Sequence, residues 1–96
     1  MTTDLTDYVA SRVAILDLVR QMLRDTMKLQ IEPEAIDPDA PLFGTGLGMD
    51  SVDAVELVIQ LDGKFGLELA GSRQAFLTIR TVNTIVDAIM EVRGES

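Results

Sequence analysis

Apolar residues recur at three- and four-residue steps over the first part of the chain, which predicts an amphipathic helix over about residues 4–28. The apolar positions of this helix are Val9, Val13, Leu16, Val19, Met22, Leu23 and Met27. Its other side carries acidic and basic residues in balance, unlike the basic helices that lie on membranes. We therefore expect the helix to dock on the protein's own core.

The stretch 30–49 holds three prolines and three glycines, which predicts a long connection and not a helix. Structureless loops longer than roughly 12–15 residues are uncommon, so we expect an ordered connection with one short helical turn. Its apolar residues are expected to anchor it to the core. These anchors are Ile31, Ile36, Leu42, Phe43, Leu47 and Met49.

A second helix is predicted from Ser51 to Phe65, with Asp50 as its N-cap and Asp53 in its first turn, where carboxylates are favoured. On a helical projection one apolar face of this helix forms a core-facing arc. That arc contains Ala54, Leu57, Val58, Leu61 and Phe65.

Three further apolar residues of this helix, Val52, Val55 and Ile59, form a second ridge outside that arc. The total apolar arc spans roughly 220°, against roughly 100° for an ordinary surface helix. Either the long connection covers the second ridge, or the ridge is exposed for a partner. Acidic residues border it, which would suit a partner with basic residues around an apolar patch. These acids are Asp53, Glu56 and Asp62.

Two more helices complete the expected fold. A short one is predicted from about Ser72 to Leu77 with Ser72 as its cap, and a last one follows Thr81 and is stopped by Gly94. Convincing strand patterns are missing. The sequence therefore predicts an all-α fold: a small four-helix bundle of three main helices and one short helix, with a long loop between the first and second, in a single domain over residues 1–96.

Charge is distributed unevenly along the 96 residues. Residues 29–63 hold eight acidic residues and no Lys or Arg, whereas the rest of the chain holds eight of each sign, so the whole net charge of −8 lies in that segment. An acidic protein is poorly suited to nucleic acid or to an anionic membrane surface, and a basic protein partner is favoured.

The residue types restrict the possible chemistry. Without Cys or His, disulfides, thiolate zinc sites, Cys nucleophiles and Ser-His-Asp triads are excluded. The remaining candidates are carboxylates, hydroxyls, Tyr8, Lys28 and Lys64, and no two are spaced as an acid/base pair. We therefore expect a protein that is not an enzyme. The start of the chain has no apolar run typical of a signal peptide or a spanning helix, and we expect a cytoplasmic monomer without membrane insertion.

Ser51 follows a glycine-rich turn and opens the second helix. Serine in such a position is commonly a helix cap, but Asp50 can already fill that role. A serine left free there is accessible to a modifying enzyme, and a phosphoester on it would meet the positive end of the helix.

The segment from Gly48 to Leu57 (Gly-Met-Asp-Ser-Val-Asp-Ala-Val-Glu-Leu) closely resembles the phosphopantetheine attachment signature of acyl carrier proteins. The likeness extends through Leu61 and Phe65, and residues 81–89 look like the last helix of that family.

The resemblance implies that Ser51 carries 4′-phosphopantetheine, added from coenzyme A by a phosphopantetheinyl transferase, and that the protein presents acyl thioesters to partner enzymes of a fatty acid, polyketide or specialised lipid pathway. It also implies a surface that meets basic residues of the transferase and of acyl-loading and acyl-processing enzymes. That surface comprises Asp50, Val52, Asp53, Val55, Glu56, Ile59 and Asp62.

Arg73 and Arg80 stand where acids are frequent in the family, and Gly63 and Lys64 replace acids at the end of the second helix. These departures favour a specialised pathway over ordinary fatty acid synthesis. The alternative hypothesis is a helical adaptor that has the carrier fold and binds a partner without a prosthetic group.

Overall fold

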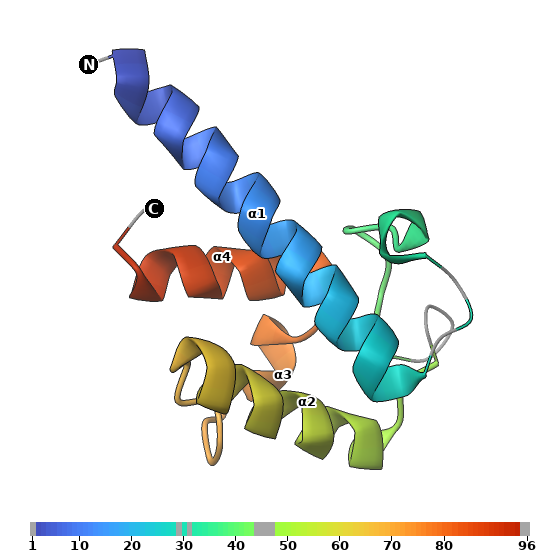
Figure 1. The fold of residues 1–96 in the computed structure, drawn as a ribbon. Helices are drawn as coiled ribbons and strands as arrows, with labels where there is room; N and C mark the ends of the chain where they lie inside the picture. Colours follow the sequence, from blue (N-terminus) through green and yellow to red (C-terminus); the bar gives the residue numbers. More distant parts are fainter. Residues whose placement is uncertain (1, 29, 31, 44–47, 95–96) are drawn as a thin grey trace.

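The computed structural model describes residues 2–28, 30, 32–43 and 48–94, and that part of the chain folds into helices and connections without a strand (Figure 1). The elements are α1 (Thr2–Met27), the short 3-10 helix η1 (Pro33–Ala35), α2 (Ser51–Phe65), α3 (Ala75–Thr78) and α4 (Val82–Val92). The predicted all-α fold, with three main helices and one short one, is confirmed.

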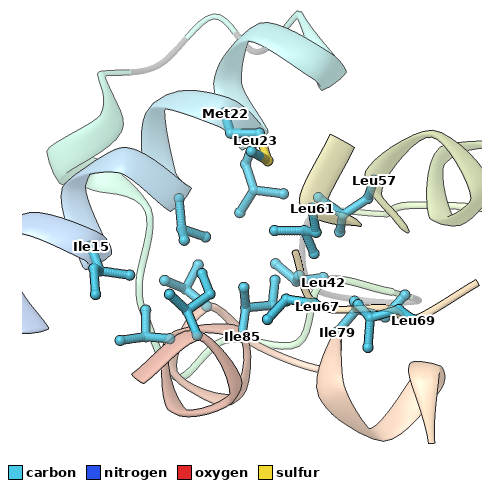
Figure 2. Close-up of a cluster of buried hydrophobic side chains, with 14 of the residues drawn as sticks. Ile15, Met22, Leu23, Leu42, Leu57, Leu61, Leu67, Leu69, Ile79 and Ile85 are labelled. Atoms are coloured by element: carbon cyan, nitrogen blue, oxygen red, sulfur yellow. The ribbon is translucent and has the colours of Figure 1, made fainter. Parts of the chain in front are cut away.

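The core lies where α1, α2 and α4 meet. Figure 2 shows Leu23, Leu61 and Ile85, each from a different helix, pointing toward one another. Among the described residues, none of the buried side chains is polar or charged. The buried hydrophobic residues of the core are Ile15, Val19, Met22, Leu23, Ile36, Leu42, Met49, Ala54, Leu57, Leu61, Leu67, Leu69, Ile79, Val82, Ile85, Val86, Ile89 and Met90.

The beginning of α1 departs from the prediction. Val9 and Val13, assigned to the core-facing side, are each 51% exposed, and from residue 5 onward Ile15 is the first buried residue of the helix. The physical reason is length: α1 has 26 residues and α4 has 11, and the N-terminal turns of α1 project beyond the other helices (Figure 1). Arg12 still joins α1 to α4, because its guanidinium lies 2.7 Å from the Asp87 carboxylate.

Hydrogen bonds to Arg20 on α1 and to Arg80 order the described part of the long connection. Arg20 Nε donates to the Ile36 carbonyl at 3.0 Å, and the Leu42 N–H donates to the Arg80 carbonyl at 2.9 Å. Among the predicted anchors, Ile36, Leu42 and Met49 are buried and Phe43 is partly buried. Ile31 and Leu47 lie outside the described residues, and η1 is the expected helical turn.

Thr81 and Gly66 mark the ends of two helices, whereas the cap predicted for α3 is not formed. The backbone N–H of Thr84 donates to Thr81 Oγ1 at 3.1 Å, so Thr81 caps α4 as predicted. Gly66 ends α2 in the left-handed conformation, with φ 68°. The expected cap at Ser72 was wrong: α3 begins at Ala75, and the Ser72 hydroxyl instead accepts the Gln74 N–H in a turn.

Candidate functional site

The start of α2 is built around a reciprocal cap. The Asp53 N–H donates to Asp50 Oδ1 and the Asp50 N–H donates to Asp53 Oδ2, both at 3.1 Å. Ser51 is the first residue of the helix, and its exposed side chain makes no hydrogen bond to another described residue. Because Asp50 caps the helix, the Ser51 hydroxyl is not needed for the cap.

The chain is held in place immediately before this serine. Met49 is buried, and its N–H donates to the Leu42 carbonyl at 3.0 Å. Gly48 has φ 74°, a conformation that glycine adopts without strain. The turn and the buried methionine therefore place Ser51 at a defined corner of the surface.

A partly open cavity of about 380 Å³ begins at Ser51 and lies between α2 and the segment 69–79. Apart from the hydroxyls of Ser51 and Ser72, the side chains that line it are apolar. The helix α2 contributes Ser51, Ala54, Val55, Val58 and Ile59, and the facing segment contributes Leu69, Ala70, Gly71, Ser72, Ala75, Phe76 and Ile79. A group attached to Ser51 therefore has direct access to an apolar space.

Asp62 holds the far wall of this cavity. Its Oδ1 accepts the Leu69 N–H at 2.7 Å and its Oδ2 accepts the Ala70 N–H at 2.9 Å. Both backbone amides belong to residues that line the cavity. Asp62, expected on a partner-binding surface, therefore also joins α2 to the connection that follows it.

The second ridge of α2 is exposed. Val52, Val55 and Ile59 are 76%, 60% and 59% exposed, so the long connection does not cover them. Glu56 on α2 and the N-cap Asp50 are exposed, and Asp53 is half-buried. The structure thus presents apolar and acidic side chains together beside Ser51.

The segment 69–79 was missed as part of the site by sequence reasoning. Its contribution depends on the fold, because these residues reach the cavity only when the connection after α2 turns back along that helix. The available signal was the wide apolar arc of α2, which required neighbours for residues such as Val58. Phe76 in particular is 67% exposed although it lines the cavity.

Within the described ranges, no helix is long and apolar enough to cross a membrane. The same part of the chain brings no three His, Cys, Asp or Glu side chains together as a possible metal site. The Ser51 hydroxyl is exposed beside the apolar cavity.

Known proteins resemble this chain over the region that contains Ser51. A family model described as "Phosphopantetheine attachment site" matches residues 17–89, a range that includes Ser51 and the cavity. The chain is 35% identical over 75 residues to the acyl carrier protein of Thermosynechococcus vestitus, covering 78% of this chain and 86% of that protein. The chain belongs to the acyl carrier protein family.

Other acyl carrier proteins are similarly related. One from Campylobacter hominis is 35% identical over 72 residues, which cover 72% of this chain and 90% of that protein. Acyl carrier protein 2 of Ralstonia nicotianae is 32% identical over 81 residues, which cover 81% of this chain and 90% of that protein. No solved structure matches the chain at a significant level.

Membership of the acyl carrier protein family identifies the prosthetic group as covalently attached 4′-phosphopantetheine. Members of this family are carriers and not catalysts, and they interact with modifying and acyl-processing enzymes. The site fits such a group, because a free, exposed hydroxyl stands at the edge of an apolar cavity.

Proposed function

We propose that Ser51 bears the 4′-phosphopantetheine group and that this carrier shuttles acyl groups between the enzymes of a fatty acid, polyketide or specialised lipid pathway. The observation that carries the proposal is the position of Ser51: it is exposed, it begins α2, and it lines the apolar cavity. The hydroxyl has no other structural task among the described residues, since Asp50 caps the helix.

The modification needs one bond to form and one to break. Ser51 Oγ attacks the phosphorus of coenzyme A that bears the pantetheine arm, which gives a phosphodiester and releases adenosine 3′,5′-bisphosphate. The hydroxyl proton is taken up by a general base, which we assign to the phosphopantetheinyl transferase. The N-terminus of α2 favours the phosphate, while Asp50 and Asp53 partly offset that attraction.

The prosthetic group supplies a thiol, which holds an acyl group as a thioester. This chain has no Cys of its own, so the sulfur must come from the attached arm. The role of the protein is to shelter the acyl group in the cavity beside Ser51. Burial of an alkyl chain there would gain about 0.8 kcal/mol per methylene, which holds a medium chain and still permits its release to an enzyme.

We further propose that partner enzymes dock on the exposed face of α2. Asp50, Asp53 and Glu56 provide the charge for basic docking surfaces, and the second ridge provides apolar contact. Asp62 belongs to the proposed surface only at its edge, because both of its carboxylate oxygens are engaged by backbone amides.

The specialised pathway is also part of the proposal. It is supported by Arg73 and Arg80, which are exposed basic residues at positions where the resemblance to the family leads us to expect acids. The expected cytoplasmic location and the monomeric state stay predictions.

The decisive experiment is mass spectrometry after incubation with coenzyme A, magnesium and a broad-specificity transferase. We expect the wild-type mass to rise by one phosphopantetheinyl group and Ser51→Ala to stay unchanged. A second known carrier protein in the same reaction verifies that the transferase is active. An unchanged wild-type mass beside a modified control would contradict the proposal.

The adaptor hypothesis makes the opposite prediction for the same variant. An unmodified adaptor would keep its partner binding and biological activity in Ser51→Ala, since the exposed ridge of α2 is unaltered. A carrier would lose activity completely while keeping its fold.

A further inference from the structure

Phe76 is an exposed aromatic residue that contacts Phe43 and is carried by a short helix anchored in the core. Its ring meets the ring of Phe43 edge to face, with centroids 6.2 Å apart and an interplanar angle of 66°. The helix α3, which carries Phe76, is anchored to the core by its C-cap Ile79, which is 1% exposed. Phe76 is 67% exposed, and the edge-to-face contact with Phe43 favours the orientation in which its ring lies beside the cavity.

The position of Phe76 along the cavity follows from the contacts at its two ends. From Ser51 to Ile59, α2 lines a length of roughly 12 Å, at 1.5 Å per residue. Leu69 and Ala70 are bonded to Asp62, so they flank the end far from Ser51.

The opposite end is the one beside Ser51. Phe43 pairs with Met49 in a short bridge, two residues before Ser51, and Phe76 contacts Phe43. Phe76 therefore stands at the end of the cavity near Ser51, which we take as the entrance for an acyl group attached to that residue.

We propose that the ring of Phe76, held by Phe43, narrows the entrance of the cavity and makes it selective for unbranched acyl chains. The inference rests on the proposed function, because it assumes that the cargo hangs from Ser51. A straight alkyl chain is slim where it passes the ring. A chain that branches next to its carbonyl carbon is widest at that point and meets the ring.

The chain offers a matched control at the next position. Leu77 is 59% exposed and lies on the same short helix, but it does not line the cavity. Truncation of Leu77 removes a similar exposed apolar side chain without changing the entrance. The comparison of Phe76→Ala with Leu77→Ala therefore distinguishes an effect on the cavity entrance from a general effect of shortening an apolar side chain on α3.

The first experiment compares two thioesters of equal carbon number on the modified protein: octanoyl, which is straight, and valproyl, which branches next to the carbonyl carbon. Cleavage by hydroxylamine is measured, and each rate is divided by that of the same acyl group on free pantetheine. We expect wild type to protect octanoyl roughly tenfold better than valproyl, a scale typical of shape discrimination in apolar pockets. In Phe76→Ala the ratio should fall to within about twofold of unity, and Leu77→Ala should resemble wild type.

Two results would overturn the selective entrance: a wild-type ratio near unity, or the same ratio in wild type and Phe76→Ala. Phe76→Leu provides a check on folding, because it keeps an apolar side chain without the ring, and we expect an intermediate ratio. Failure of the protein to accept phosphopantetheine is visible in its mass beforehand. That failure would contradict the proposed function and would leave the proposed selectivity of the cavity entrance unaffected.

A second experiment needs no prosthetic group. Unmodified protein is titrated with octanamide or with its branched isomer valpromide, and the methyl resonances of Val58 and Ile79, which line the cavity, are followed by NMR. We expect wild type to respond to octanamide and Phe76→Ala to respond to both amides. Equal responses of wild type to the two isomers would show that Phe76 does not restrict entry.

Discussion

Asp50 and Asp53 cap one another at the start of α2, each carboxylate accepting the backbone N–H of the other at 3.1 Å. Ser51 lies between them, at the first position of the helix. Two of the acidic residues proposed to meet partner enzymes therefore also fix the backbone that presents the attachment site. Mutations at these positions change structure and charge together, unless the substitution preserves the cap.

Asp50→Ala should lower the free energy of unfolding by about 1 kcal/mol, because the side chain that accepts the Asp53 N–H is lost. Asp50→Asn should keep most of the wild-type stability, since asparagine caps helices about as well as aspartate. Urea denaturation followed by circular dichroism measures both. Equal losses in the two variants would show that charge at the helix terminus, and not the cap hydrogen bond, supplies the stability.

Glu56→Lys should slow modification by the transferase roughly tenfold at low salt, because Glu56 is exposed on the proposed docking face and has no role in the cap. Steady-state rates give the effect, which should shrink as salt screens the charges. Glu91→Lys, on α4, is the matched control: either variant changes the net charge from −8 to −6.

Asp87 serves less well as a control, because its carboxylate pairs with Arg12 at 2.7 Å. If Glu91→Lys slows modification as much as Glu56→Lys, the overall charge governs docking and the local face does not.

The sequence predicted α2 and α4 well because both helices carry their own boundary signals. Asp50 and Thr81 cap the two helices, and each helix buries a periodic apolar face against α1 or its neighbours. Helix periodicity identifies which side of a helix is apolar. It does not say how far along the helix a partner extends, which is why Val9 and Val13 were wrongly assigned to the core.

The cavity could not be predicted from local sequence patterns. It depends on Asp62 bonding to amides seven and eight residues further on, and on Phe76 meeting Phe43 across the fold. In the sequence Asp62 looks like one more acidic residue of the partner-binding surface. Only the path of the connection after Gly66 brings the carboxylate to those amides. Ser51, in contrast, could be selected from its position after a cap and a glycine-rich turn.

Val52→Ser should weaken docking of the transferase and leave stability within about 0.5 kcal/mol of wild type, because Val52 is 76% exposed and does not line the cavity. Losing the burial of one valine against a partner is worth about 1 kcal/mol, so we expect KM to rise roughly fivefold. Val92→Ser on α4, where the side chain is 56% exposed, should leave KM unchanged. An unchanged KM in Val52→Ser would show that the second ridge is not part of the docking surface.

Asp62→Ala should destabilise the protein by about 1–3 kcal/mol, because the N–H groups of Leu69 and Ala70 lose a charged acceptor at 2.7 Å and 2.9 Å. Asp62→Asn should fall between wild type and alanine: its oxygen can accept one amide, but its NH₂ group faces the other. Urea denaturation gives the free energies, and amide hydrogen exchange at Leu69 and Ala70 should accelerate in both variants.

Glu34→Ala is a suitable control for Asp62→Ala, since it removes an exposed acidic side chain on η1 and should stay within about 0.5 kcal/mol of wild type. Asp62 has two candidate roles, and they give different results. If Asp62 acts only in docking, Asp62→Ala will match Glu34→Ala in stability and in the exchange of Leu69 and Ala70, while modification by the transferase slows. If it holds the cavity wall, stability and local exchange change even with no enzyme present, because the hydrogen bonds lie within the chain itself.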